Sequence, residues 1–334
     1  MTILKTELLF YKSKIVSADA TNGGRMSANQ IISGVVNNVW PHVLKAERDA
    51  GSTLYRKLFA KVANDLDETL LSATMWNDLP TDGDDWIVLF AATQRDTQAD
   101  ITGTERLYGC GTLNTDVAAG GSTIIVDVED ATLTGIFADT DTIRITDMAD
   151  PDAVTGNEEL LTISGAPSVV GTTVTITVAE TLANAYTVAS GTRVMSIYPV
   201  GDIKCTTDNW VETSTAGTYD EGAYPPIIDN IGTVDETWTL TFTDATNYTV
   251  VGDTLGTIGS GTTAADFAPV NADFSKPYFT LEFAGFAGTW AAGETIVFQT
   301  HPAAAPIWLK RVVPAGAASL SGNKNTTVLS GEST

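Results

Sequence analysis

Short runs in which threonine alternates with an apolar residue recur along this chain. Thr173–Val178 reads Thr-Val-Thr-Ile-Thr-Val, and Trp238–Thr243 reads Trp-Thr-Leu-Thr-Phe-Thr. Because successive side chains of an extended strand face opposite sides, each run has one apolar and one hydroxylated face. The pattern predicts half-buried β-strands with a polar outer face.

The alternation is densest after Gly120, where Gly, Asp, Asn and Pro separate five predicted strands. These five strands are Ser122–Val128, Thr142–Thr146, Glu159–Ser164, Thr173–Val178 and Thr192–Tyr198. Their spacing is typical of a small antiparallel barrel or sandwich. A second β-region follows, with strands predicted near Thr237–Thr243, Pro277–Phe283 and Thr295–Phe298.

The two ends of the chain give more varied signals. Ile3–Tyr11 and Trp86–Phe90 predict strands, and Ser27–Val36 predicts a short helix with Ser27 as its N-cap. Leu54–Val62 fits a helical and a strand template equally well, so the local pattern leaves both open. At the other end, Ile307–Val313 predicts a strand that returns to the core, followed by a mobile polar tail.

These elements predict a mainly β protein: a β-sandwich core with one or two inserted antiparallel β-barrel or sandwich modules and little helix. The expected division is residues 1–115 for the N-terminal part of the core, 116–200 for an inserted module and 201–299 for a second β-region. Residues 300–334 then hold the returning strand and the tail. A chain of 334 residues that is 43% hydrophobic is long enough for two or three such units.

Charge is divided unevenly along the chain. The net charge is −23, but residues 1–61 carry nine of the 18 basic residues and only four acids, a local charge of +5. The remainder carries −28. Such an acidic body repels nucleic acid and anionic membranes, whereas the basic segment is suited to dock on an acidic neighbour, including another copy of the chain. No stretch approaches the ~20 apolar residues of a membrane span, and the first residues lack a secretory pattern. We therefore expect synthesis in the cytoplasm without export.

Residue types that usually carry catalysis are scarce. The chain has two histidines, His42 and His301, and two cysteines, Cys110 and Cys205. Neither histidine lies near a nucleophile motif, and the cysteines are too far apart in the sequence for a metal cluster. We predict no catalytic, cofactor-binding or metal-binding residues, although calcium in the acidic loop Asp147–Asp152 is left open. Seven tryptophans can serve either as core and interface residues or as sugar-stacking platforms.

Two separated stretches resemble structural proteins of tailed bacteriophages. Ala46–Phe59 reads Ala-Glu-Arg-Asp-Ala-Gly-Ser-Thr-Leu-Tyr-Arg-Lys-Leu-Phe, and with 86–90 and 93–98 it is similar to uncharacterised tail proteins of contractile-tailed phages. Residues 300–316, Thr-His-Pro-Ala-Ala-Ala-Pro-Ile-Trp-Leu-Lys-Arg-Val-Val-Pro-Ala-Gly, carry the same resemblance. The resemblance implies a core sandwich interrupted by inserted modules, with Tyr55–Val62 as a strand.

The resemblance further implies a non-enzymatic virion component in the tail or baseplate, at the tube–sheath junction, that acts by subunit contacts. Its expected partners are tail tube, sheath or baseplate subunits and further copies of itself in a six-fold ring, without membrane or nucleic acid. The predicted contact residues are the clustered cations Lys5, Lys12, Lys14, Arg48, Arg56, Lys57, Lys61, Lys310 and Arg311. The alternatives are a head decoration or head–tail joining protein and a carbohydrate-binding or receptor-binding β-module.

Overall fold

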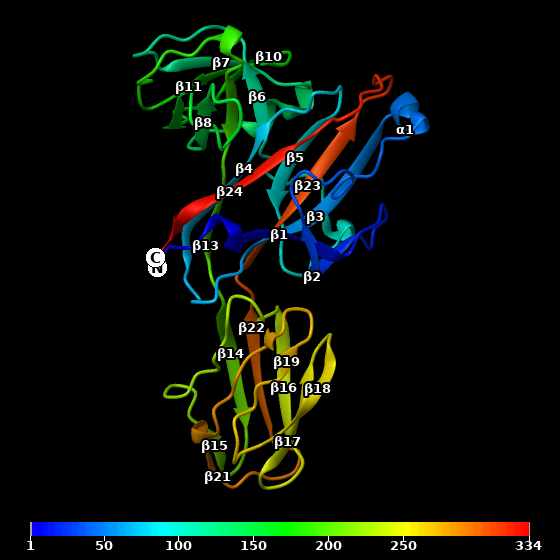
Figure 1. Cartoon of the computed structure of the whole chain (residues 1–334), viewed down its shortest axis with the longest axis vertical. Helices are drawn as coiled ribbons and strands as arrows, with labels where there is room; N and C mark the ends of the chain where they lie inside the picture. The colour runs from blue at the N-terminus through cyan, green and yellow to red at the C-terminus, as the bar shows by residue number, and fades with distance from the viewer. Residues whose placement is uncertain (1, 334) are drawn as a thin grey trace.

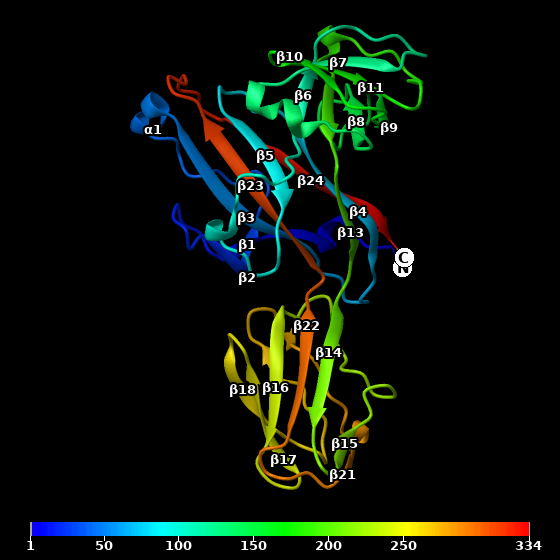
Figure 2. The same ribbon diagram turned by 180° about the vertical axis from the view of Figure 1, so that it is seen from behind.

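The computed structural model describes residues 2–333 and has a mainly β fold, as the sequence predicts. Figures 1 and 2 show three β-regions along the long axis of the molecule, a central region with one further region at each end. We call residues 110–196 the first module and residues 206–301 the second module. The two chain ends lie side by side in the central region, where the backbone NH of Ile3 donates to Ser333 Oγ at 3.0 Å.

The central region is a β-sandwich. Its larger sheet has the antiparallel order β2-β1-β3-β23-β5, formed by β1 (Leu8–Ile15), β2 (Gly23–Ile31), β3 (Ser52–Val62), β5 (Trp86–Ala91) and β23 (Ala304–Val313). The smaller sheet has the order β13-β4-β24, formed by β4 (Leu70–Leu79), β13 (Tyr198–Ile203) and β24 (Thr326–Ser333). Leu58, Ile307 and Met75 meet between the two sheets in one buried apolar cluster.

The first module is a seven-stranded antiparallel sheet with the order β10-β11-β7-β6-β12-β8-β9. Its strands are β6 (Cys110–Leu113), β7 (Thr123–Asp127), β8 (Thr142–Thr146), β9 (Glu158–Thr162), β10 (Ser168–Val170), β11 (Thr173–Thr177) and β12 (Arg193–Ser196). A bridge between Ile163 and Val178 brings the β9 end next to β11, so the sheet curls around a core of Ile, Val and Leu side chains. This core forms because every second residue of the Thr-Val-Thr-Ile pattern points inward.

The second module has a five-stranded sheet with the order β14-β22-β16-β17-β18. Its strands are β14 (Thr206–Thr213), β16 (Glu236–Phe242), β17 (Asn247–Gly252), β18 (Gly256–Thr262) and β22 (Thr295–His301). Two short pairs complete it: β15 (Gly217–Tyr219) with β21 (Phe286–Gly288), and β19 (Val270–Asn271) with β20 (Lys276–Pro277). In β16 the side chains of Trp238, Leu240 and Phe242 enter an aromatic core, while the intervening threonines face outward.

Helical structure is limited to short segments. The α-helix α1 spans Lys45–Ala50. The 3-10 turns are η1 (Lys5–Glu7), η2 (Gln98–Asp100), η3 (Ala131–Ile136), η4 (Val188–Ser190) and η5 (Phe283–Gly285).

Three local predictions are wrong. The helix expected at Ser27–Val36 is instead the end of β2 and a turn, because β2 pairs with β1 along the sheet edge. The strand expected at Pro277–Phe283 is reduced to the two residues of β20, isolated bridges and η5. The polar tail is not mobile throughout, since residues 326–333 form β24, whose backbone pairs with β4.

The ambiguous segment Leu54–Val62 is strand, within β3, which pairs with β23 from Ser52–Val313 to Lys61–Ala304. The predicted division at residues 115, 200 and 299 stays a prediction. The sheets themselves change after Ala91, at Ile197, at Lys204–Cys205 and at Pro302–Ala303.

Candidate functional site: the charged module junctions

The chain crosses between the central sandwich and the second module twice, along neighbouring paths. It leaves through Lys204–Cys205, between β13 and β14, and returns through Pro302–Ala303, between β22 and β23. The two crossings are adjacent because Thr206 pairs with His301 in the antiparallel ladder of β14 and β22. Two short adjacent connections allow the second module to swing as on a hinge. Side-chain contacts between the second module and the central sandwich are therefore needed to hold it in place.

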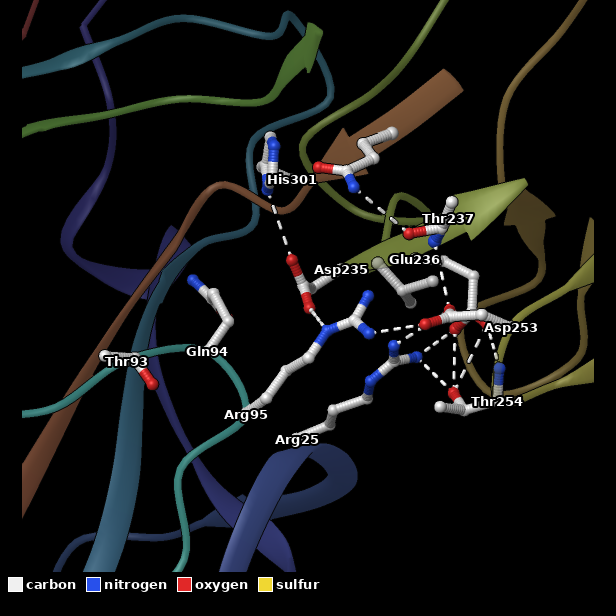
Figure 3. Close-up of polar contacts among 12 residues, drawn as sticks. Arg25, Thr93, Gln94, Arg95, Asp235, Glu236, Thr237, Asp253, Thr254 and His301 are labelled. Carbon is white, nitrogen blue, oxygen red and sulfur yellow. Dashed lines mark hydrogen bonds and ion pairs between the residues drawn. The ribbon is translucent and has the colours of Figure 1, made fainter. Parts of the chain in front are cut away.

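A cluster of charged side chains spans this junction (Figure 3). Arg25, from β2 of the central sheet, forms ion pairs with Glu236 and Asp253 of the second module. Arg95, from the loop after β5, binds Asp235 through Nε at 2.6 Å and Asp253 through Nη1 at 2.5 Å. Two cations of the central region are thus inserted among three carboxylates of the module.

Glu236 is the most buried member of this cluster. Its side chain has no exposed area, and besides Arg25 it accepts hydrogen bonds from the backbone NH groups of Thr254 at 2.5 Å and Leu255 at 3.2 Å. A buried carboxylate is costly unless it is paired and hydrogen-bonded. Glu236 therefore ties the start of β16 and the turn after β17 to the central sheet in one defined geometry.

His301 adds a titratable group to the same junction. Its Nδ1 lies 3.1 Å from Asp235 Oδ1 and its Nε2 lies 3.2 Å from Asp208 Oδ1. A neutral imidazole has one N–H, so donation to both carboxylates requires the imidazolium. The hydrogen bond to Asp235, with that to Asp208, raises the pKa of His301. Although burial opposes it, the bonds from His301 and Arg95 lower the pKa of Asp235.

Two buried lysines of β3 lie beneath this junction. Lys57 Nζ is 2.6 Å from Asp96 Oδ1 and donates to the carbonyl of Gly24 at 2.7 Å. Lys61 Nζ donates to the Ile231 carbonyl of the second module at 2.8 Å and lies 4.6 Å from the centre of the Phe274 ring. Burial without a contacting carboxylate lowers the pKa of Lys61 to about 8.

The first module is attached by a smaller buried cluster around Asp78 of β4. The carboxylate of Asp78 is fully buried and binds Arg144 of β8 at 2.5 Å and Arg193 of β12 at 3.0 Å. It also accepts from the indole NH of Trp76 at 3.1 Å. Each module is thus fixed to the central sandwich by arginine–carboxylate pairs that join residues far apart in the sequence.

The nine predicted contact residues divide into two groups. Lys5 and Lys14 are exposed, and Lys12, Arg48 and Lys310 are half-buried. The other four are buried within the chain and bind internal groups, which corrects the expectation that they form a contact surface. These four are Arg56, Lys57, Lys61 and Arg311. Part of the basic segment is also neutralised within the chain, since Arg25 pairs with the acidic second module and Lys5 pairs with Asp152 at 2.5 Å.

Other candidate residues have internal roles. Five of the seven tryptophans are buried, including Trp238 and Trp290, so these two do not form an exposed sugar-stacking surface. Both cysteines are free thiols. Within residues 2–333 no three His, Cys, Asp or Glu side chains are grouped as a metal site. None of the helices between Thr2 and Ser333 has the length and apolar character that a membrane crossing requires.

Sequence reasoning missed the junction residues Arg25, Arg95, Asp235 and Glu236 because their partners lie 140 to 229 positions away. No local sequence signal marks them, since Arg25 stands between Gly24 and Met26 and Arg95 stands beside Asp96. Compared with known proteins, the chain matches no family model, and no curated protein matches it.

Proposed function

We propose that this chain is a non-enzymatic structural component of a tailed-phage virion that acts by subunit contacts in the tail or baseplate, at the tube–sheath junction. One observation carries the proposal. The stretches that resemble phage structural proteins supply three neighbouring strands of one sheet, since β23 (within 300–316) pairs with β3 (which begins within 46–59) on one side and β5 (which contains 86–90) on the other. The resemblance thus concerns a contiguous piece of structure rather than two unrelated fragments.

The junctions support a role in which the protein holds its two modules in one fixed arrangement. Buried ion pairs add little net stability compared with apolar contacts, but breaking one is costly because it leaves an uncompensated charge. Arg25–Glu236 and Asp78–Arg144 therefore favour one arrangement of the modules over others. A chain with modules fixed at opposite ends of a central sandwich (Figure 1) is suited to hold neighbouring subunits at set positions.

The contact surface in this proposal is the face of β1 that carries Lys12 and Lys14. Lys12 and Lys14 project from the same face of β1, opposite to Tyr11 and Ser13, which are buried. An acidic surface on a neighbouring subunit, including another copy in a six-fold ring, has the complementary charge. Cyclic symmetry is the usual arrangement when one contact is repeated head to tail.

The test is charge reversal followed by virion assembly. Phage carrying the double change Lys12→Glu and Lys14→Glu should lose this protein from purified tails, while the isolated variant keeps its circular dichroism spectrum. Lys45→Glu is the matched control, because Lys45 is an exposed lysine of the same basic segment and pairs with Asp49 on its own helix. Normal incorporation of the double variant would overturn the contact surface, and co-purification of the wild-type protein with heads instead of tails would overturn the position in the tail.

A further inference from the structure

The segment that joins β2 to α1 begins with a turn, residues 32–38, that exposes apolar side chains although its backbone is held in place. Asn38 Nδ2 donates to the Ile32 carbonyl at 2.9 Å, and Trp40 packs against the buried cluster between the two central sheets. The exposed apolar side chains of this turn are Ile32, Val35 and Val36. We call residues 32–38 the apolar turn. Neighbouring exposed apolar groups of this kind mark a contact surface.

The surroundings of the apolar turn are uncharged or positive. Residues 26–44 contain no Asp, Glu, Lys or Arg, in a chain whose net charge is −23. Positive charge lies next to this stretch, because Phe10 of β1 pairs with Ile31 and Lys12 is two positions further along β1. Lys14 follows on the same face of the strand. An apolar surface with a positive rim is complementary to a partner surface that is apolar at its centre and acidic around it.

The loop between β8 and β9 of the first module, residues 147–157, has this complementary character. It contains three aspartates and no Lys or Arg. Val154, in the second half of the loop, is 98% exposed. Lys5 offsets the charge of Asp152 within the chain. Asp150 is also exposed, and its Oδ1 accepts from the backbone NH of Asp152 at 2.9 Å, which shapes the loop without neutralising the carboxylate.

The two surfaces belong to opposite sides of the molecule. Figure 2 shows α1, at the end of the segment that carries the apolar turn, on one side and β9, at the end of the acidic β8–β9 loop, on the other. One chain can therefore contact two neighbours at once, with a different surface toward each. A contact of this head-to-tail kind repeats from copy to copy and forms a ring when its rotation closes. Because this chain carries both complementary surfaces, its natural partner is a second copy.

We propose that the β8–β9 loop of a second copy of this chain docks on the apolar turn, with Val154 packed against the turn and the aspartates of the loop near Lys12 and Lys14. The inference rests on the proposed function, in which the face of β1 that carries these two lysines contacts a neighbouring subunit. It adds the identity of that neighbour, the surface that the neighbour presents and the apolar centre of the contact.

The experiment is disulfide trapping between two variants of the purified full chain, with copper–phenanthroline as the oxidant. Val36→Cys mixed with Val154→Cys should give a disulfide-linked dimer on a non-reducing gel, because the contact brings the two thiols together. The matched control is Val36→Cys mixed with Val170→Cys, since Val170 is 78% exposed, as Val36 is, and lies on β10 of the same module. Each variant alone gives the background from the native thiols Cys110 and Cys205.

The mixture with Val154→Cys should give several-fold more dimer than the mixture with Val170→Cys or any variant alone. Adding Lys12→Glu and Lys14→Glu to the Val36→Cys chain should reduce the yield, because the charges then repel. A yield no higher than that of the Val170→Cys mixture would overturn the contact. Co-purification with heads or tails is a separate readout: a chain found in tails that gives no trapped dimer overturns this contact alone, whereas a trapped chain found with heads overturns only the position in the tail.

Discussion

Replacing Lys61 by methionine should stabilise the protein at neutral pH, which is unusual for the loss of a buried hydrogen bond. The pKa of Lys61 falls from 10.5 to about 8 because its ammonium group is fully buried. At about 1.4 kcal/mol for each pH unit, the charged lysine costs the folded state about 3 kcal/mol below pH 8. Methionine removes this cost but leaves the Ile231 carbonyl without its donor, a loss of about 1–2 kcal/mol. The free energy of unfolding of Lys61→Met at neutral pH should therefore exceed that of the wild type by about 1–2 kcal/mol.

The sign of the pH dependence makes this prediction specific. Between pH 8 and 10.5 the unfolded chain binds more protons at this lysine than the folded chain, so the wild type gains stability as pH rises. Urea unfolding followed by circular dichroism should therefore show the advantage of Lys61→Met shrinking, then reversing, over this range. Lys45→Met, at an exposed position, should show no such trend. If the difference in unfolding free energy between Lys61→Met and the wild type is constant from pH 7 to 10.5, the lowered pKa of Lys61 is refuted. Destabilisation of Lys61→Met by more than about 2 kcal/mol at pH 7 would refute it as well.

Three further changes test the junctions and the tail strand. Because the pKa of His301 is raised, its stabilising contribution is present below about pH 6.5 and fades as pH rises through the folded pKa. His301→Gln should therefore lower the free energy of chemical unfolding more at pH 5.5 than at pH 8.5, by at most about 1 kcal/mol for this part-exposed group. An equal loss at both pH values would contradict the imidazolium. Asp78→Asn should destabilise by about 3–5 kcal/mol, because it leaves Arg144 and Arg193 buried without a counter-charge; a loss below 1 kcal/mol in the same assay would contradict this. Deleting residues 326–333 should lower the melting temperature and promote aggregation measured by light scattering, since it uncovers the edge of β4. A deletion variant as stable and soluble as the full chain would contradict a role of β24 in covering that edge.

The strands that the sequence predicted well are those with their own amphipathic pattern. Thr142–Thr146 matches β8 at both ends, and Thr237–Thr243 is displaced by one residue from β16. In these segments every second side chain is apolar and enters a module core, so the local pattern and the tertiary structure agree. The mainly β fold class follows from such segments.

Strands at sheet edges were not predictable in this way. Strand β2 reads Gly-Gly-Arg-Met-Ser-Ala-Asn-Gln-Ile, which has little intrinsic strand preference, and it is extended because β1 offers a pairing edge. Strand β24 is polar and half-exposed along most of its length, so its sequence has the pattern expected of a mobile C-terminal segment. In both cases the partner strand, rather than the local sequence, determines the structure.

The candidate site was even harder to predict from the local sequence, because its residues bind partners that are distant along the chain. Alternating lysines at Lys57 and Lys61 normally indicate a solvent-facing side of a strand, but here the loop at Asp96 and the second module cover that face. Ile231, which binds Lys61, lies 170 positions further along the chain. Charge counting found the basic segment, but it could not separate cations paired within the chain from those left exposed.

The central claim, that this protein acts by repeated subunit contacts, is tested most directly by the mass of the purified full-length protein in solution. Mass photometry should be carried out with and without a tail tube protein of the tailed phage to which we propose the chain belongs. We expect a hexamer, or a monomer that forms rings once the tube protein is added. A 35.2 kDa monomer that ignores the tube protein at every concentration would contradict the account.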